Sequence, residues 1–122
     1  MAKVNWINGK IAPPESGEYY VLLEAQQDIR DPDTNELLVS AGDVKMTGDW
    51  YDAKRRYFDS VGENNPFWRV LSWANVLNPD VLSWTKVMKL DVPEDIKPRL
   101  RTYFGVKVKW EDGKWLTEKR KS

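Results

Sequence analysis

The segment Val70–Asp80, VLSWANVLNPD, is followed directly by Val81–Asp91, VLSWTKVMKLD, so that eleven residues are written twice in succession. Six of the eleven positions are identical. Duplication at a short period usually doubles one structural element, so this pair sets the architecture of the chain around it. The shared residues are mostly apolar or aromatic, and they indicate fold rather than chemistry.

The doubled segment is predicted to form two antiparallel strands, because Asn78, Pro79 and Asp80 between the copies favour a turn. β-branched and aromatic residues dominate both copies and favour strands over helix. Alternation along each strand divides the side chains between two faces. The first copy sets Leu71, Trp73, Asn75 and Leu77 against Val70, Ser72, Ala74 and Val76, and the second sets Leu82, Trp84, Lys86 and Met88 against Val81, Ser83, Thr85 and Val87. The alternative is a helix over 66–77 with Asn65 as N-cap and Pro66 in its first turn.

Composition predicts a single domain over residues 1–122, long enough to bury a stabilising core without disulfides or structural metals. There is no Cys, which excludes disulfides and thiolate chemistry, and no His, which removes the usual proton shuttle and the commonest metal ligand. We therefore expect no enzymatic activity and no cofactor. Nineteen basic and nineteen acidic side chains cancel, so no overall field attracts nucleic acid, although a local patch remains open.

The chain has no apolar run that resembles a signal peptide or approaches the roughly 20 residues of a membrane span. We expect a soluble protein of the cytoplasm with no membrane partner. Seven Trp, five Tyr and three Phe are generous for this length, so some aromatic side chains are expected at the surface. Exposed Trp-rich strands would need covering, which makes a homo-oligomer plausible.

Several short strands are predicted before the doubled segment. Residues 18–24, EYYVLLE, have the tyrosines and β-branched centre of a half-buried strand. Residues 26–30 and 37–40 flank a polar turn and predict a hairpin extension. The triplets WYD, 50–52, and YFD, 57–59, flank the charged turn AKRR and are expected to face each other as hairpin arms.

After the doubled segment, residues 93–104 are predicted to form the one helix, with acids in the first turn and Gly105 at the end. Its apolar stripe would be Ile96, Leu100, Tyr103 and Phe104, and Pro98 should kink or delay it. VKVKW, EDGK and WLTEK then predict a C-terminal hairpin with Trp110 opposite Trp115. The fold class is therefore α+β and β-rich: an antiparallel sheet of five to eight short strands, this helix and the hairpin.

Two aromatic groups are candidate binding residues. Trp50, Tyr51, Asp52, Tyr57 and Phe58 could form an aromatic platform with acids at its rim, suited to a sugar, a base or a partner protein. Trp68 beside Arg69 could be an exposed stacking pair. For both groups the competing interpretation is ordinary packing on the sheet.

Acidic residues give weaker signals. Pro32-Asp33 with Asp52-Ala53-Lys54, and Pro79-Asp80 with Asp112-Gly113-Lys114, fit a loose nuclease pattern that needs two acids on a divalent metal. Asp49, Asp52 and Asp59 could supply a glycosidase pair. Short patterns match by chance and acids are common at turn edges, so neither reaction is favoured, and no metal site is predicted.

Trp6-Ile7, the Pro13–Gly17 turn before YVLL, the WYD and YFD triplets, and VLSW followed by Pro79 together resemble domain of unknown function family 551. Its members are small proteins found largely in phages and prophages, which start with Trp-Ile and end near a Thr-His-Trp-Met-Pro run. The resemblance covers about residues 6–79. Ser72 or Ser83 stands where the family usually has His, the closing motif appears twice, and the tail from Pro93 lies outside the pattern.

The resemblance implies a family-like β core at 6–79, and we expect residues 80–122 to pack on it as an extension. It supplies no reaction. It implies an accessory protein of phage or prophage type, in the bacterial cytoplasm or associated with the virion. We expect a binding module that contacts a protein partner through exposed aromatics. The alternatives are a nucleic-acid-binding or host-defence-inhibiting protein, which requires a clustered basic face, and a metal-dependent hydrolase.

Overall fold

The computed structural model describes residues 5–75, 92–103 and 105–117. The chain is β-rich, with antiparallel and parallel strand pairs, and one 3₁₀ turn is the helical element among the residues described. The predicted β-rich character is therefore confirmed. The second copy of the doubled segment and the turn before it lie outside the described residues.

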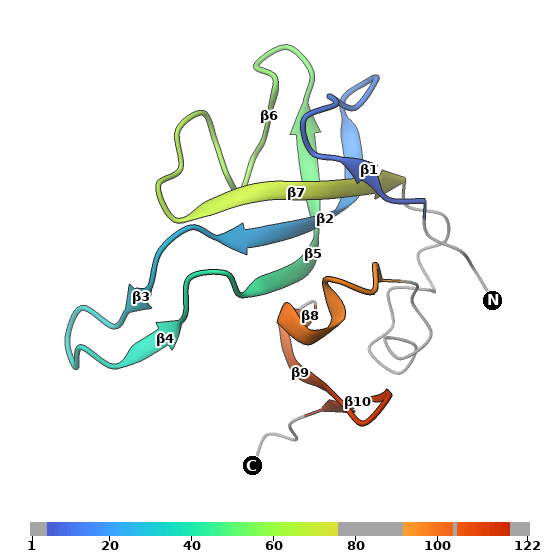
Figure 1. Ribbon diagram of the computed structural model, residues 1–122. Coiled ribbons are helices and arrows are strands. Elements are labelled where there is room, and N and C mark those ends of the chain that lie inside the picture. Colours follow the sequence, from blue (N-terminus) through green and yellow to red (C-terminus); the bar gives the residue numbers. More distant parts are fainter. Residues whose placement is uncertain (1–4, 76–91, 104, 118–122) are drawn as a thin grey trace.

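Eight strands form one sheet in the order β1-β7-β2-β5-β8-β9-β10, with β6 paired to β5 off this path (Figure 1). The short pair β3-β4 extends the β2-β5 hairpin beyond one end of the sheet (Figure 1). The bounds are β1 Ile7–Asn8, β2 Gly17–Ala25, β3 Ile29–Arg30, β4 Leu37–Val39, β5 Val44–Asp52, β6 Tyr57–Phe58, β7 Trp68–Asn75, β8 Leu100–Tyr103, β9 Val106–Glu111 and β10 Lys114–Thr117.

Strand β2 lies between β7 and β5 and is buried on both faces, because apolar residues run through its centre without alternation. Tyr20 and Leu22 belong to one core cluster, with Val44, Met46, Leu100 and Tyr103. Tyr19, Val21 and Leu23 belong to a second cluster on the other face, with Tyr51, Phe58 and Trp73. We call these faces the closed face and the open face, respectively.

Strand β7 settles the two interpretations of residues 66–77: its described part is a strand, and the helix is wrong. Strict alternation is also wrong, because the register shifts from Leu22↔Ser72 to Leu23↔Val70 and leaves Leu71 in a bulge. Leu71 therefore packs on the closed face with Ala74, whereas Val70 joins Trp73 on the open face.

The bulge at Leu71 provides a hydrogen-bond acceptor for the residue that follows the edge strand β1. The Leu71 carbonyl accepts a hydrogen bond of 2.8 Å from the Gly9 N–H. A Cβ on Gly9 would lie 2.3 Å from the Val70 carbonyl oxygen, so only glycine fits this close approach.

The outer edge of β5 is shared by two segments. Val44–Met46 pair in parallel with β8, while Tyr51 and Asp52 pair with Phe58 and Tyr57 of β6. The prediction that WYD and YFD face each other is therefore confirmed, as are the strand over 18–24 and the hairpin formed by β3 and β4.

The helix predicted over 93–104 is wrong. Two successive turns lead from Pro93 into the 3₁₀ helix η3, Lys97–Arg99, and the chain then becomes strand β8. Pro98 lacks the N–H that a helix interior needs, and β8 instead fills the vacant edge of β5. Ile96, Leu100 and Tyr103 are still buried together, but from a turn and a strand.

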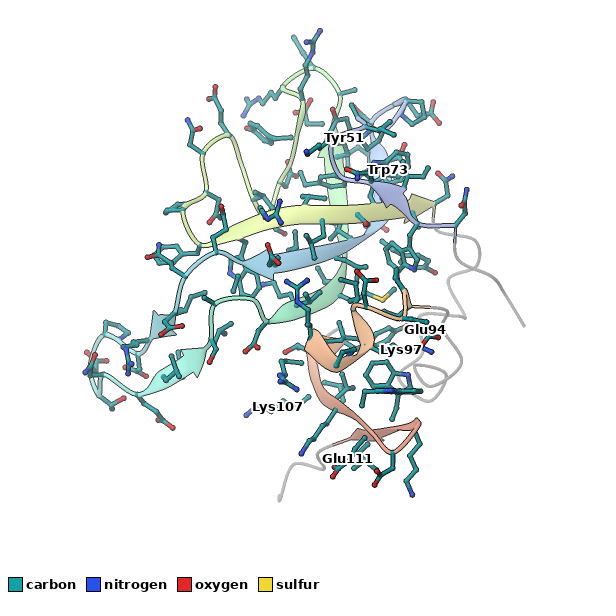
Figure 2. The ribbon with its side chains drawn as sticks, viewed as in Figure 1. Tyr51, Trp73, Glu94, Lys97, Lys107 and Glu111 are labelled. Atoms are coloured by element: carbon teal, nitrogen blue, oxygen red, sulfur yellow. The ribbon has the colours of Figure 1, made fainter. Side chains whose placement is uncertain are left out.

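The C-terminal hairpin is confirmed. Trp110 pairs with Trp115, and their rings meet edge to face with centroids 4.9 Å apart. Lys97 Nζ lies 4.6 Å from the Trp110 ring centroid and 2.7 Å from Glu94 Oε1, so the charge on this lysine is balanced. Figure 2 shows Glu94 and Lys97 together, on the opposite side of β9 from Lys107.

Candidate functional site: a basic groove

A groove of about 410 Å³ lies on the open face, where β5, β8 and β9 continue beyond the second core cluster. Its walls come from β4, from the start of β7 and from β10. The lining combines cationic, apolar and aromatic side chains, namely Leu38, Val39, Asp43, Val44, Lys45, Trp68, Arg101, Thr102, Lys107, Val108, Lys109 and Leu116. We call it the basic groove.

Strand alternation places the groove lysines. Val106 and Val108 of β9 pack against the closed-face cluster, so Lys107 and Lys109 point to the open face. In β5, Val44 and Met46 are buried on the closed face, and Lys45 between them points to the open face. Figure 2 shows Lys107 projecting from β9 toward the side on which the β3-β4 hairpin lies.

Lys45 and Trp68 form the inner wall of the basic groove. Lys45 Nζ lies 4.1 Å from the Trp68 ring centroid, a distance at which the ring face attracts the cation. Burial lowers the pKa of Lys45 because it disfavours the charged form, and Asp49 partly offsets that effect. One face of this indole is thus covered by an ammonium group.

Four cationic side chains line the groove with a single carboxylate, Asp43. Arg101 Nε lies 3.5 Å from Asp43 Oδ1, while Asp43 Oδ2 also accepts from the Ser40 N–H at 3.1 Å. Lys109 Nζ lies 3.5 Å from Glu111 Oε2, but both side chains are about half exposed and such a pair contributes little. The lining residues therefore include more cationic than anionic side chains.

Apolar side chains are exposed beside these charges. Leu38 of β4 is 58% exposed and Leu116 of β10 is 41% exposed. Both side chains line the groove together with Trp68 and the groove cations. A ligand in the groove would therefore meet apolar surface and positive charge together.

The predicted aromatic platform is divided by the sheet. Tyr51 and Phe58 are buried on the open face with ring centroids 5.0 Å apart, whereas Trp50 is 47% exposed. Trp50 follows the parity of Val44 and Met46 along β5, so it faces the other way. Tyr51, Tyr57 and Phe58 line a second, smaller pocket, and Figure 2 shows Tyr51 beside Trp73 at the end of the sheet away from Lys107.

The Trp68–Arg69 stacking pair is not formed, because each residue has a different partner. Trp68 stacks with Lys45, whereas Arg69 Nε donates to Glu24 Oε1 at 2.6 Å. Glu24 also binds Arg99, so one carboxylate holds two guanidinium groups.

The acidic candidates are tied into turns. Asp52 Oδ1 accepts from the backbone N–H groups of Lys54 and Arg55 at 3.0 and 3.1 Å. Buried Asp49 accepts from Trp50 and Ser60 N–H groups. Asp33 and Asp112 lie in hairpin turns, and Asp80 lies outside the described residues. In the ranges that the structure describes, no three acidic side chains gather as a metal site would require.

Sequence reasoning missed Lys45, Arg101, Lys107 and Lys109. The alternation in VKVKW was a usable signal, since it puts two lysines on one face of a strand. Nothing local predicted that parallel pairing of β5 with β8 would bring Lys45 and Arg101 beside them.

No known protein family matches this chain, and neither a curated protein nor a solved structure emerges as a relative. The resemblance to family 551 therefore stays a prediction. Across the described segments, no helix has the length and apolar character needed to cross a membrane.

Proposed function

We propose that this protein is a non-catalytic binding module whose basic groove accommodates an acidic, apolar-containing segment of a partner protein. The observation that carries the proposal is the gathering of four cations around apolar walls in a chain with a net charge of zero. Such local charge favours an oppositely charged partner and speeds its encounter.

The apolar walls support a protein partner. Leu38 and Leu116 leave contact area exposed to water in the groove. Protein interfaces bury such apolar contacts at their centre and place charged groups around them. A partner segment with leucine-like side chains between carboxylates would make apolar contacts with these walls and ion pairs with the cations.

The aromatic content of the groove argues against single-stranded nucleic acid as the first choice. Binding of that class depends on open aromatic faces on which successive bases stack. Among the lining residues only Trp68 is aromatic, and Lys45 covers one face of its ring. A clustered basic face is nevertheless what the nucleic-acid alternative requires, so an oligonucleotide belongs in the test.

The partner's source rests on the family resemblance alone. A phage or prophage accessory protein, acting in the bacterial cytoplasm or on the virion, would bind a host or phage protein. A second copy of this chain is another acidic-apolar candidate, and sedimentation at several concentrations separates self-association from binding of a different protein.

Calorimetry with two acetylated, amidated peptides, EDLEDLEDL and its neutral counterpart QNLQNLQNL, tests the proposal. We expect the acidic peptide to bind at least about tenfold more tightly, because only it pairs with the groove cations. Lys107→Gln with Lys109→Gln should remove most of that difference. Lys54→Gln is the matched control, since Lys54 is exposed in the β5-β6 turn and does not line the groove.

Equal binding of the two peptides, or an unchanged affinity in the double variant, would rule out the groove as the acidic-peptide site. Tighter binding of a ten-nucleotide oligothymidine than of the acidic peptide would replace the proposal with the nucleic-acid alternative.

A further inference from the structure

The second pocket on the open face has a volume of about 290 Å³ and lies at the opposite end of β5 from the basic groove. Tyr51, Tyr57 and Phe58 line it together with two cationic side chains, Lys10 and Arg56. No acidic residue is among its lining residues. We call it the tyrosine pocket, and we propose that it binds a small aromatic carboxylate.

The aromatic part of the ligand is inferred from the lining. Tyr51 and Phe58 meet at an interplanar angle of 62° and are almost fully buried, so they close one side of the pocket with ring surface. Val61 and Val70 add aliphatic surface. A planar apolar body makes favourable edge-to-face or offset contacts with such rings.

The carboxylate is inferred from the donors. Neither Lys10 nor Arg56 has an ion-pair partner among the described residues, and the planar guanidinium of Arg56 suits a carboxylate held by two hydrogen bonds. The Tyr57 hydroxyl accepts from Arg55 Nη1 at 3.0 Å, which leaves its own O–H to donate. Arg55 thus orients a third donor at the pocket.

The walls are fixed before any ligand arrives. The segment between β1 and β2 is held by the Trp73 Nε1–H, which donates to the Ile11 carbonyl at 2.6 Å, and by the Tyr19 hydroxyl, which donates to the Glu15 carbonyl at 2.8 Å. The start of this segment is fixed at Gly9, where the backbone lies against the Val70 and Leu71 carbonyl groups of β7. A rigid pocket loses little conformational entropy on binding.

The opposite wall is fixed in the same way. Val61 and Gly62 N–H groups both donate to the Phe58 carbonyl, at 3.0 and 2.8 Å. Arg56 itself sits at a φ of 63°, a left-handed conformation that a side chain rarely adopts, and its N–H donates to the Asp52 carbonyl at 2.7 Å. The turn thus fixes the backbone of Arg56 beside the pocket.

The test uses benzoate as the probe, with benzamide and acetate as matched partial probes, followed by ¹H–¹⁵N chemical shifts of the full chain. We expect benzoate to shift the amide signals of Gly9, Tyr57 and Gly62 with a dissociation constant on the order of 1 mM, as suits a fragment of this size. Benzamide lacks the charge and acetate lacks the ring, so each should bind at least about tenfold more weakly.

Arg56→Gly separates binding from folding. Glycine adopts a positive φ without strain, so the thermal midpoint should not fall, while benzoate affinity should drop about tenfold with the loss of the guanidinium. Tyr57→Phe should weaken binding less, because it removes one donor. Lys54→Gln removes a cation from the same turn without touching the pocket and should change nothing.

Absence of benzoate shifts at these amides up to about 20 mM overturns the proposal. So does acetate binding as tightly as benzoate, which would show anion attraction without recognition of the ring. Retention of full benzoate affinity in Arg56→Gly would also overturn it.

Discussion

The two faces of β5, β8 and β9 are built from alternate residues of the same strands, yet they have opposite characters. On the closed face, Val44, Tyr103 and Val108 are almost fully buried in a cluster that also contains Val92 and Ile96. On the open face, Lys45, Lys107 and Lys109 line a groove.

One pattern of alternation along these strands therefore serves stability on one face and recognition on the other. Substitutions on the closed face should act on the free energy of unfolding, because they leave cavities. Substitutions of the cationic and apolar side chains that line the basic groove should act on ligand affinity, because side chains such as Leu38 and Leu116 are already partly solvated.

Leu100→Ala should lower the free energy of unfolding by about 2–4 kcal/mol, because Leu100 is fully buried among Val44, Ile96 and Tyr103. Leu116→Ala on the open face should cost less than about 1 kcal/mol, since Leu116 is 41% exposed. Urea denaturation of both variants measures the contrast, and similar losses would mean that the groove is part of the core.

Alkaline pH should destabilise the closed face. Burial raises the pKa of Tyr103 and of Tyr20 above the unfolded value of about 10, so the folded state binds more protons above that pH. This contribution to stability is complete below about pH 10 and is lost as pH rises further. Tyr103→Phe should make stability fall less steeply with pH, because it removes one of the two buried hydroxyls. A pH series of urea midpoints is the measurement, and an unchanged slope in Tyr103→Phe would refute the assignment.

Lys45→Met should change the unfolding free energy by less than about 1 kcal/mol, since loss of the contact with Trp68 is offset by removal of a desolvated charge. The contribution of Lys45 to stability changes with pH in the opposite direction to that of Tyr103. A lowered folded pKa means that stability rises as pH approaches 10.5, the ordinary lysine value, and Lys45→Met should reduce that rise. Its affinity for the acidic peptide should nevertheless fall about fivefold. A large stability loss with unchanged affinity would reverse the roles of the two faces.

Local patterns in the sequence were sufficient for hairpins and insufficient for long-range pairing. WYD and YFD, like Trp110 and Trp115, lie close along the chain, and turn chemistry brought each pair into register. The helix at 93–104 failed because its apolar spacing fits a helix, but Pro98 and the open edge of β5 favoured a turn followed by a strand. Helical propensity is easily overridden by tertiary contacts.

The candidate sites were predictable only in part. The aromatic triplets indicated Tyr51, Tyr57 and Phe58, which do line a pocket. The prediction that Trp50 and Tyr51 share one exposed surface was wrong, because successive residues of β5 point to opposite faces of the sheet. The bulge at Leu71 reverses the alternation of side chains between the two faces of β7, and nothing in the VLSW sequence indicates it. Lys45 and Lys107 are 62 residues apart, and only the β5-β8-β9 pairing brings them to one groove.

If the basic groove binds acidic, apolar segments, titration with the EDLEDLEDL peptide should shift the amide signals of the residues that line it. We expect the largest shifts at Lys45, Thr102, Lys107 and Lys109, and we expect them to shrink as salt is raised, since ion pairing at an exposed groove is screened. Shifts confined to other regions, or shifts of equal size with the QNLQNLQNL peptide, would contradict it.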